Sequence, residues 1–377
     1  MTTKRDFLRA TGAVALTASA AACTPAANTA APGYSRPYSR NPFAAPRPSM
    51  DNVIRAITGL RPFRPQGFVV RSEDIDGKLV VHNYGHGGSG LTLGWGSSAL
   101  AVREVAGQKQ RPVAVLGSGI MGLTSARLLQ EAGWPVTIYT RDPYRHTTSN
   151  VAAGEWGPFG VGDPAQMTPA FESQLVWAAQ VSHHAYTNLT GPKYGIRWME
   201  SWELYANEPE SFDLDDPIQK LNSFHGVKPP GEHPFGDKFA RHFVTMQMDP
   251  GTLMRQLLAD FRLAGGRLEI RNFENLSKVM ELNETVVFNC TGLGARELFG
   301  DEDLLPAKGQ LVFMPPDPGV DYMLFGGGGD EFLHMFPRGD VILMGGFFRL
   351  GDWTTHVEPD QTERIVTEHQ RLFAEFG

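Results

Sequence analysis

The stretch VAVLGSGIMG, residues 113–122, decides the fold of this chain. Its four leading apolar residues predict a short buried strand, and the pattern Gly-x-Gly-x-x-Gly follows directly. We expect a helix from there to Gly133 and a second strand at Val136–Tyr139. A strand, a tight turn, a helix and another strand in this order form the unit that binds dinucleotides. The sequence therefore predicts a dinucleotide site here.

Each glycine of this pattern has its own role. Gly117 permits the tight turn, Gly119 lets a pyrophosphate approach the backbone, and Gly122 lets the helix pack against the strand. The pyrophosphate then meets the positive end of the helix dipole. The alternative is a glycine-rich turn in another kind of α/β fold. The residues assigned to cofactor binding here are Gly117, Ser118, Gly119, Ile120, Met121 and Gly122.

The identity of the dinucleotide depends on the end of the second strand, where an acidic residue is expected to bind the ribose hydroxyls. Arg141 occupies that position, and Asp142 comes next. Asp142 can take the role, whereas an arginine there can also accommodate the 2′-phosphate of NADP. The motif alone leaves the cofactor open, and both Arg141 and Asp142 are assigned to cofactor binding.

Composition excludes several classes of protein. The chain has 377 residues, 41% hydrophobic and 20% charged, which is typical of globular proteins. The net charge of -7 does not suit the basic surface that nucleic acids require, so no nucleic-acid partner is expected. No spacing of histidines and cysteines indicates a metal site. Cys290 ends an apolar strand, and we expect an inert core thiol there.

Residues 1–23 are predicted to be an export signal. The motif KRDFL, residues 4–8, resembles a twin-arginine signal with Lys in place of the first Arg, and the apolar stretch 10–22 is too short to span a bilayer. Cys23 follows three alanines, so ordinary cleavage and a lipid anchor at Cys23 both remain open. Residues 24–49 are expected to be a flexible linker. The protein is then expected in the periplasm or cell envelope, or in the cytoplasm if the signal is not functional; a disordered Ala-rich tail is the alternative.

Strands and helices along the rest of the chain predict two layers of different origin. The stretch 60–65, with two prolines, is expected to be turn-rich rather than helical. Helices are expected at residues 91–105, 168–188, 251–264 and 361–376, and strands at 79–82, 286–290, 309–314, 331–336 and 341–347.

Several segments resemble one known family. The loop His146–Trp156, HTTSNVAAGEW, resembles the loop after the second strand in the D-amino acid oxidase family, which wraps the flavin. The segments Gly59–Pro65, GLRPFRP, and His82–Thr92, HNYGHGGSGLT, resemble the family's C-terminal signatures. Shorter similarities are Asn289–Gly292, Lys308–Gln310 and Gly345–Trp353. The resemblance spans residues 50–377 and is patchy between 160 and 242.

The order of these segments differs from that of the family. Both C-terminal signatures precede the dinucleotide motif here, and the helix at 361–376 resembles the one that leads into them in the family. Joining Gly377 to the region of Met50 restores the family order, so we expect a circularly permuted chain. That rearrangement requires the two joined ends to lie close together.

The resemblance implies an α/β fold, with an FAD-binding Rossmann-type domain plus a substrate domain that has a mixed, largely antiparallel sheet. Three parts follow: a permuted segment, 50–108, that completes the substrate and flavin sites, a Rossmann core, 109–165, and a substrate domain, 166–377, with strands that return to the FAD domain. The loop residues that the resemblance assigns to FAD are Thr147, Thr148, Ala153 and Gly154.

The glycine turn at residues 87–92 leads into a helix. Its backbone N–H groups and the positive end of the helix dipole can face the flavin and stabilise negative charge on its reduced form. A plain helix-capping turn is the alternative. The residues assigned to FAD here are Gly87, Gly88, Ser89, Gly90, Leu91 and Thr92.

Three residues are expected to act on the substrate. Arg61 takes the place of the family's carboxylate-binding arginine, a role that suits the planar guanidinium, and the carbonyl of Gly88 takes the place that receives the substrate amine. His334 stands where the family has a tyrosine, and we expect it to donate a hydrogen bond and add pH dependence near neutrality. A second family tyrosine falls at Asp330. An acidic residue near the pocket, either Asp330 or Glu331, would favour basic substrates. Structural roles for Arg61 and His334 are the alternatives.

The resemblance implies an FAD-dependent oxidase that deaminates D-amino acids to 2-oxo acids, ammonia and hydrogen peroxide, with the D-amino acid and molecular oxygen as its partners. Glycine, an N-methyl amino acid or D-aspartate are alternative substrates, and a membrane carrier is an alternative electron acceptor. The missing tyrosines also leave open an exported flavin-binding protein without turnover, and a nicotinamide-dependent dehydrogenase is the plainest interpretation of the dinucleotide motif. His82 and His86, in the glycine-rich turn, are expected to be structural.

Overall fold

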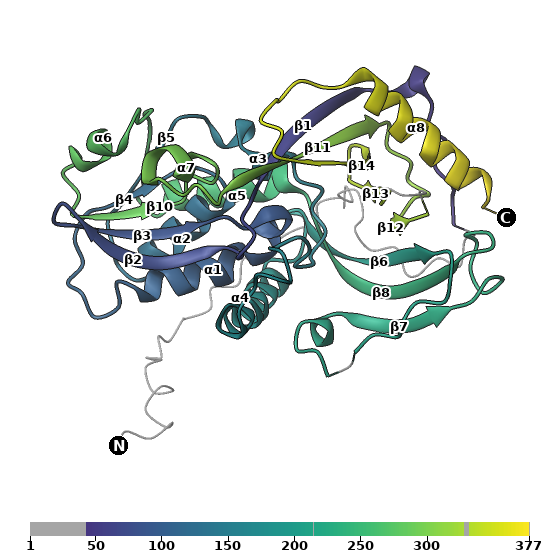
Figure 1. Cartoon of the computed structure of the whole chain (residues 1–377), viewed down its shortest axis with the longest axis horizontal. Coiled ribbons are helices and arrows are strands. Elements are labelled where there is room, and N and C mark those ends of the chain that lie inside the picture. Colours follow the sequence, from purple (N-terminus) through teal and green to yellow (C-terminus); the bar gives the residue numbers. More distant parts are fainter. Residues whose placement is uncertain (1–42, 214, 328–331, 377) are drawn as a thin grey trace, which may run out of the picture. The chain divides into compact units, whose positions relative to one another are not determined.

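The computed structural model describes residues 43–213, 215–327 and 332–376, and the glycine pattern lies there in a six-stranded sheet (Figure 1). The strand order is β2-β3-β10-β4-β5-β9, and all neighbouring strands are parallel except β2 and β3. The strands are β2 (Val69–Ile75), β3 (Lys78–Tyr84), β4 (Val113–Leu116), β5 (Val136–Thr140), β9 (Arg267–Ile270) and β10 (Val286–Asn289).

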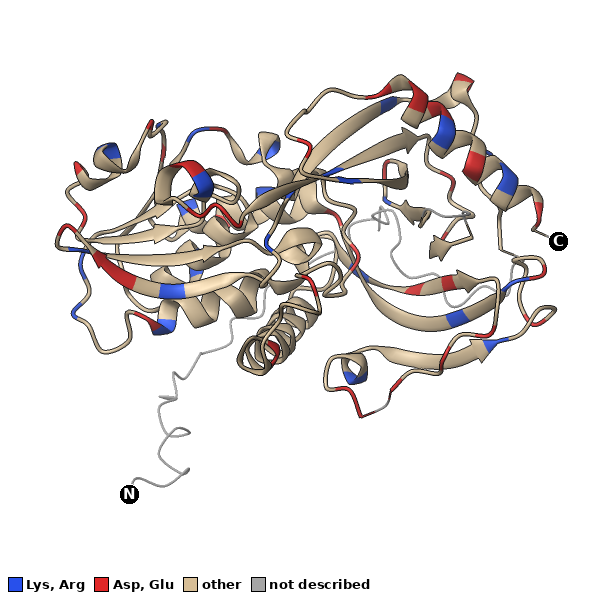
Figure 2. Ribbon diagram, viewed as in Figure 1, with Lys and Arg blue, Asp and Glu red and all other residues tan. Residues whose placement is uncertain are grey.

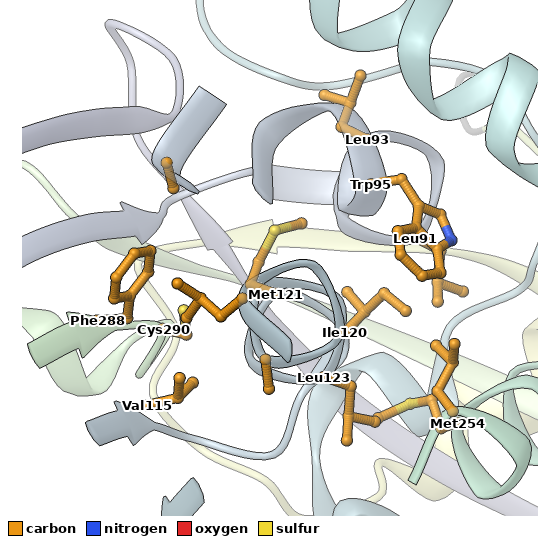
Figure 3. Packing of buried hydrophobic residues seen from close by; sticks show 14 of the residues in the cluster. Leu91, Leu93, Trp95, Val115, Ile120, Met121, Leu123, Met254, Phe288 and Cys290 are labelled. Atoms are coloured by element: carbon orange, nitrogen blue, oxygen red, sulfur yellow. The ribbon is translucent and has the colours of Figure 1, made fainter. Parts of the chain in front are cut away.

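Both faces of this sheet are covered, as parallel sheets require. Because side chains alternate along a strand, Val113 and Val115 of β4 enter one core and Ala114 and Leu116 enter another. The first core is completed by α1 (Gly90–Arg103) and α2 (Ile120–Glu131), and Figure 3 shows part of it. The second core lies under α6 (Leu276–Met280).

The second sheet has eight strands in the order β1-β11-β14-β13-β12-β6-β8-β7. Its neighbouring strands are antiparallel except β6 and β12. The strands are β1 (Arg55–Phe63), β6 (Ile196–Tyr205), β7 (Ser223–Lys228), β8 (Phe239–Met248), β11 (Leu305–Met314), β12 (Tyr322–Gly326), β13 (His334–Pro337) and β14 (Ile342–Leu350). The expected fold class, a Rossmann-type sheet plus a mixed, largely antiparallel sheet, is confirmed.

The four helices expected outside the glycine motif are confirmed to within two residues at each end. They are α1, α4 (Pro169–Asn188), α5 (Pro250–Leu263) and α8 (Pro359–Ala374). Helix α8 buries Ile365, Val366 and Leu372 against the second sheet, and Figure 2 shows charges of both signs along this helix. The remaining helices of the described residues are α3 (Thr148–Val151) and α7 (Gly294–Phe299), with 3-10 turns η1 (Met50–Asn52), η2 (Gly87–Ser89), η3 (Tyr144–His146) and η4 (Gln219–Leu221).

Strand β1 corrects the expectation of a turn-rich stretch at residues 60–65. The chain stays extended for nine residues and ends at Phe63. Pro62 is tolerated because β1 lies at the edge of the sheet and pairs with β11 alone, where Pro62 faces Pro306. This strand carries Arg61 into the interior.

The first described residues and the last helix lie side by side. The carbonyl of Pro48 accepts a hydrogen bond from Gln370 Nε2 at 2.9 Å, and the ring of Phe43 packs 5.5 Å from that of Phe235, which also contacts Phe376. Residues 43–49, expected to be linker, therefore pack against the second sheet; the rest of 24–49 and the expected signal, 1–23, lie outside the described residues. In the described part of the chain, no helix is long and apolar enough to cross a membrane.

Candidate active site

A cavity of about 1650 Å³ extends from the glycine turn after β4 to the strands β1 and β13 of the second sheet. Pockets for single small molecules usually enclose about 300–1,000 Å³, so this one has room for a dinucleotide together with a small substrate. Of the predicted site residues, all line the cavity except Gly122 and Ser89. The cavity has two chemically different ends.

The glycines shape the first end of the cavity. Gly117 has a φ of 102°, and a Cβ atom built on it would lie 2.6 Å from the carbonyl oxygen of Cys290. A Cβ on Gly122 would collide with the carbonyl of Gly117, which explains why Gly122 supports the turn from behind without lining the cavity. Helix α2 begins at Ile120 with Gly119 as its N-cap, and the N–H of Ile120 donates to Ser149 Oγ at 3.1 Å. The positive end of the helix dipole lies at the cavity wall, where it can attract an anion.

The end of β5 presents an ion pair to this cavity. Arg141 Nε lies 2.7 Å from Asp142 Oδ2, and both side chains are substantially exposed. The Asp142 carbonyl is held by the hydroxyls of Ser118 and Thr140. A ribose at this position would therefore meet a carboxylate and a guanidinium together. This explains why the position along the sequence could not decide between Asp142 and Arg141 as the ribose ligand.

The loop after β5 is fixed from three sides. Thr148 Oγ1 donates to the carbonyl of Leu60 at 3.0 Å, and Gly154, with a φ of 98°, lies directly against the carbonyl of Met248. The buried guanidinium of Arg338 donates to the carbonyls of Ala152 and Ala153. Burial lowers the pKa of Arg338 to about 10, so it stays charged at neutral pH. Thr147 donates to the carbonyl of Tyr144, which closes the start of the loop.

The glycine turn at residues 87–92 packs against a second loop. Gly87 has a φ of 54°, and the N–H of Gly88 donates to the carbonyl of Gly160 at 3.2 Å. The hydroxyls of Ser89 and Thr92 donate to the carbonyls of Phe159 and Gly157. Ser89 is fully buried and its side chain serves this packing, so it does not face the cavity. Gly90 and Leu91 start α1 at the cavity wall.

Arg61 forms the other end of the cavity. Its guanidinium lies against Gly309, where a built Cβ would be 2.5 Å from Nη1, and its stem passes Gly88. Within the described residues, no carboxylate and no hydrogen-bond acceptor pairs with this guanidinium. Burial lowers its pKa, but a guanidinium stays charged in proteins. A buried cation without a protein partner in a cavity is a site for an anionic group of a ligand.

His334 lies beside Arg61, on β13. Its ring contacts Gly345 and packs 5.3 Å from the ring of Phe336. Burial, with the positive charge of Arg61 as the next cause, lowers the pKa of His334 to about 3. The expectation of titration near neutrality is therefore wrong: His334 is a neutral hydrogen-bonding group at physiological pH. Asp330 and Glu331 lie outside the described residues.

Glu155 is a cavity residue to which the sequence analysis gave no role. Its Oε1 accepts a hydrogen bond from Ser201 Oγ at 2.9 Å, while Oε2 is enclosed and has no partner among the described residues. Burial raises the pKa of this carboxyl well above its usual value. An acidic residue inside the apolar run Ala152-Ala153-Gly154-Glu155-Trp156 was the available signal.

The two histidines of the glycine-rich turn have structural contacts, as expected. His86 stacks on Phe68 and bonds Ser97, and burial lowers its pKa to about 3. His82 lies 2.8 Å from Glu73. Cys290 is buried, and burial raises its pKa to about 12, so the expected inert thiol is confirmed.

Comparisons with known proteins agree with this geometry. The family model DAO, described as FAD dependent oxidoreductase, matches residues 112–377. A D-amino-acid oxidase of Streptomyces coelicolor is 30% identical over 275 residues, which cover 70% of this chain and 78% of that protein. A D-amino-acid oxidase of Rubrobacter xylanophilus is 30% identical over 270 residues, covering 69% and 77%. A D-aspartate oxidase of Homo sapiens is 25% identical over 265 residues, covering 68% and 74%.

A solved structure shares the fold. Glycine oxidase from Bacillus cereus superposes with a TM-score of 0.51 at 16% identity, over 68% of this chain and 77% of that one. The cavity fits FAD: the left-handed turn at Gly117 and the positive dipole end of α2 suit a pyrophosphate, and the volume accommodates a whole dinucleotide. The cofactor is FAD, which resolves the choice that the end of β5 left open.

Proposed function

The chain belongs to the D-amino acid oxidase (DAO) family of FAD-dependent oxidoreductases, and from this premise we propose that it oxidises D-amino acids to 2-oxo acids, ammonia and hydrogen peroxide. The observation that carries the proposal is the guanidinium of Arg61, which has no partner among the described residues and lies in the same cavity as the glycine turn. A guanidinium offers a carboxylate two parallel hydrogen bonds, so it fixes the orientation of an amino acid.

A bound flavin would supply the acceptor for the hydride of the substrate and the route by which both electrons reach oxygen. Arg61 holds the substrate carboxylate, and the carbonyl of Gly88, whose built Cβ lies 3.8 Å from Arg61 Cδ, accepts an N–H of the amine. The substrate loses a hydride from Cα and a proton from nitrogen, and water then converts the imine to a 2-oxo acid and ammonia. Two electrons and two protons reduce oxygen to hydrogen peroxide, which balances the reaction.

The neutral ring of His334 is suited to a hydrogen bond with the substrate carboxylate, beside Arg61. The N-terminus of α1, at Gly90 and Leu91, is suited to stabilise negative charge on the reduced cofactor through its backbone N–H groups. In this scheme the protein binds and orients the substrate and shields it from water. No side chain has to remove a proton from the Cα of the substrate.

We further propose that the chain is circularly permuted relative to its family. The family model begins at residue 112, yet β1, β2, β3 and α1 precede that point and complete both sheets. The hydrogen bond between Pro48 and Gln370 supports closeness of the two ends that the family order would join. A chain rearranged to run from residue 110 to 377 and then from 50 to 109 is expected to bind FAD with the same absorption spectrum. Loss of flavin binding in a folded rearranged chain would contradict the proposal.

The first 23 residues are proposed to direct export of the folded protein by a twin-arginine-like route, with Cys23 as a candidate lipid attachment site. Fusing residues 1–49 to a reporter that folds before export tests this. Export that persists after Lys4 and Arg5 are both replaced by Gln would exclude that route.

The experiment that tests the activity is an anaerobic substrate screen followed by flavin absorbance. We expect D-amino acids to bleach the flavin, and oxygen to restore its colour with formation of hydrogen peroxide. Faster bleaching by glycine, an N-methyl amino acid or D-aspartate would replace the proposed substrate. A reduced flavin that oxygen does not reoxidise indicates a membrane acceptor, and a flavin that no amino acid bleaches indicates a binding protein.

A further inference from the structure

Glu155 is a second ionisable group of this cavity that has no partner of opposite charge in the described part of the chain. It lies in the loop after α3, where a β-bridge to Gln247 on β8 fixes its backbone. Its side chain reaches Ser201 on β6, which binds only one of its two oxygens. The second oxygen, Oε2, is enclosed and has no hydrogen-bond partner within residues 43–213, 215–327 and 332–376.

A neighbouring carboxylate shows what a structurally satisfied acid looks like in this fold. Glu203, two residues after Ser201 on β6, receives the guanidinium of Arg241 at 2.7 Å and the hydroxyl of Tyr205 at 2.9 Å. Glu155 has no such cation in the described part of the chain. Burial raises the pKa of Glu155 and so favours its neutral form, and a cation supplied by a ligand is the partner that would stabilise the carboxylate.

Glu155 and Arg61 do not pair with each other in the described part of the chain. They form no ion pair in the described residues, and neither is among the causes of the other's pKa shift, whereas Arg61 does lower the pKa of His334. In the second sheet, Arg61 lies on β1, His334 on β13 and the Ser201 that holds Glu155 on β6, so the strand of His334 lies between the other two. A ligand that touches both charges has to be elongated.

The wall between the two charges is apolar. Phe325 and Phe336 line the cavity with His334, and their rings pack 4.9 Å apart. Such a wall suits the methylene groups of a long side chain. The carboxyl group of Glu155 can meet a cation at the far end, because its terminal torsion is soft and the residue retains surface on the cavity side.

We propose that Glu155 selects substrates whose side chain ends in a positive charge, so that D-lysine and D-arginine are preferred over uncharged D-amino acids of the same length. The inference rests on the proposed D-amino acid oxidase activity. In it, Arg61 binds the carboxylate, the aromatic wall covers the methylene chain, and Glu155 binds the terminal ammonium or guanidinium.

Binding of two inert carboxylates tests this without turnover. The molecule 6-aminohexanoate is lysine without its α-amine, and hexanoate lacks the terminal charge as well. We expect the holoenzyme to bind 6-aminohexanoate about 10- to 100-fold more tightly, measured from the change in flavin absorbance, because a charge-assisted hydrogen bond contributes that much. Glu155→Gln is expected to abolish the difference, while Glu363→Gln, which removes the same charge from the exposed surface of α8, keeps it.

Turnover separates this inference from the proposed function. Flavin reduction is compared for D-lysine and D-norleucine, and Glu155→Leu is expected to reverse the preference. If D-norleucine reduces the flavin as well as D-lysine does, and the two inert carboxylates bind equally, the role of Glu155 is refuted while the oxidase activity stands. If no D-amino acid reduces the flavin, the oxidase activity fails, and the binding comparison alone decides on Glu155. Glu155→Gln that slows both substrates equally with unchanged binding also refutes the proposal.

Discussion

The two ends of the cavity are built on different principles. At the nucleotide end, backbone geometry makes the site: Gly117 adopts a left-handed conformation and α2 begins at the cavity wall. At the substrate end, side chains make the site, and Arg61 and Glu155 are both without a partner of opposite charge among the described residues. The backbone alone can form a site for a cofactor that stays bound. A substrate site instead uses side chains whose partners of opposite charge are supplied by the substrate.

Replacing Arg61 should give the largest effect at the substrate end. We expect Arg61→Ala to lower kcat/KM by about 100- to 1000-fold, about 3–4 kcal/mol, because the substrate carboxylate loses its bidentate partner in a buried site. The loss should appear mainly in KM, with flavin content unchanged. Steady-state kinetics checks this, and Arg61→Lys should recover only part of the loss. Unchanged kinetics would remove Arg61 from the site.

The nucleotide end should respond in the opposite way. Gly117→Ala is expected to weaken FAD binding about tenfold or more, because its φ of 102° and the Cys290 carbonyl 2.6 Å from the new Cβ both oppose a side chain. Flavin content measured by absorbance reports the effect. Gly107→Ala is the matched control, since Gly107 also has a positive φ of 78° but open space around it. Equal flavin loss in both variants would point to general destabilisation.

Two arginines three residues apart sharpen the comparison. Arg64 has partners, since it lies 3.0 Å from Asp301 and 3.2 Å from Asp303, whereas Arg61 has none in the described part of the chain. We expect Arg64→Ala to lower the free energy of unfolding by about 1 kcal/mol and to leave kcat/KM unchanged, because partly exposed ion pairs contribute little. Thermal unfolding and kinetics on one preparation check both parts. A large rise in KM would mean that the two arginines act together.

The same contrast explains what could be predicted from the sequence. The strand at Val113–Leu116 and the helix after it were predicted nearly residue by residue, because a glycine pattern is local. The strand at Arg55–Phe63 was missed, since its proline, Pro62, is tolerated only at a sheet edge. Ser89 was assigned to FAD, but it binds the carbonyl of Phe159, a contact 70 residues away that no local pattern encodes. Glu155 was overlooked for the same reason: its burial depends on strands β6 and β8.

His334 offers the smallest expected effect and the sharpest test of burial at the substrate end. Because its pKa is lowered to about 3 in the folded protein, it stays neutral between pH 6 and 8, and kcat/KM should show no inflection from it there. His334→Gln should therefore keep the shape of the pH profile over this range, even if the rate changes.

In the unfolded chain the same group protonates below its ordinary pKa of about 6.5, so stability should fall as pH drops from there toward 3. His334→Gln should make that fall less steep in thermal unfolding. An inflection near pH 6.5 that disappears in His334→Gln would mean that the ring is solvated and that this end of the cavity is open to water.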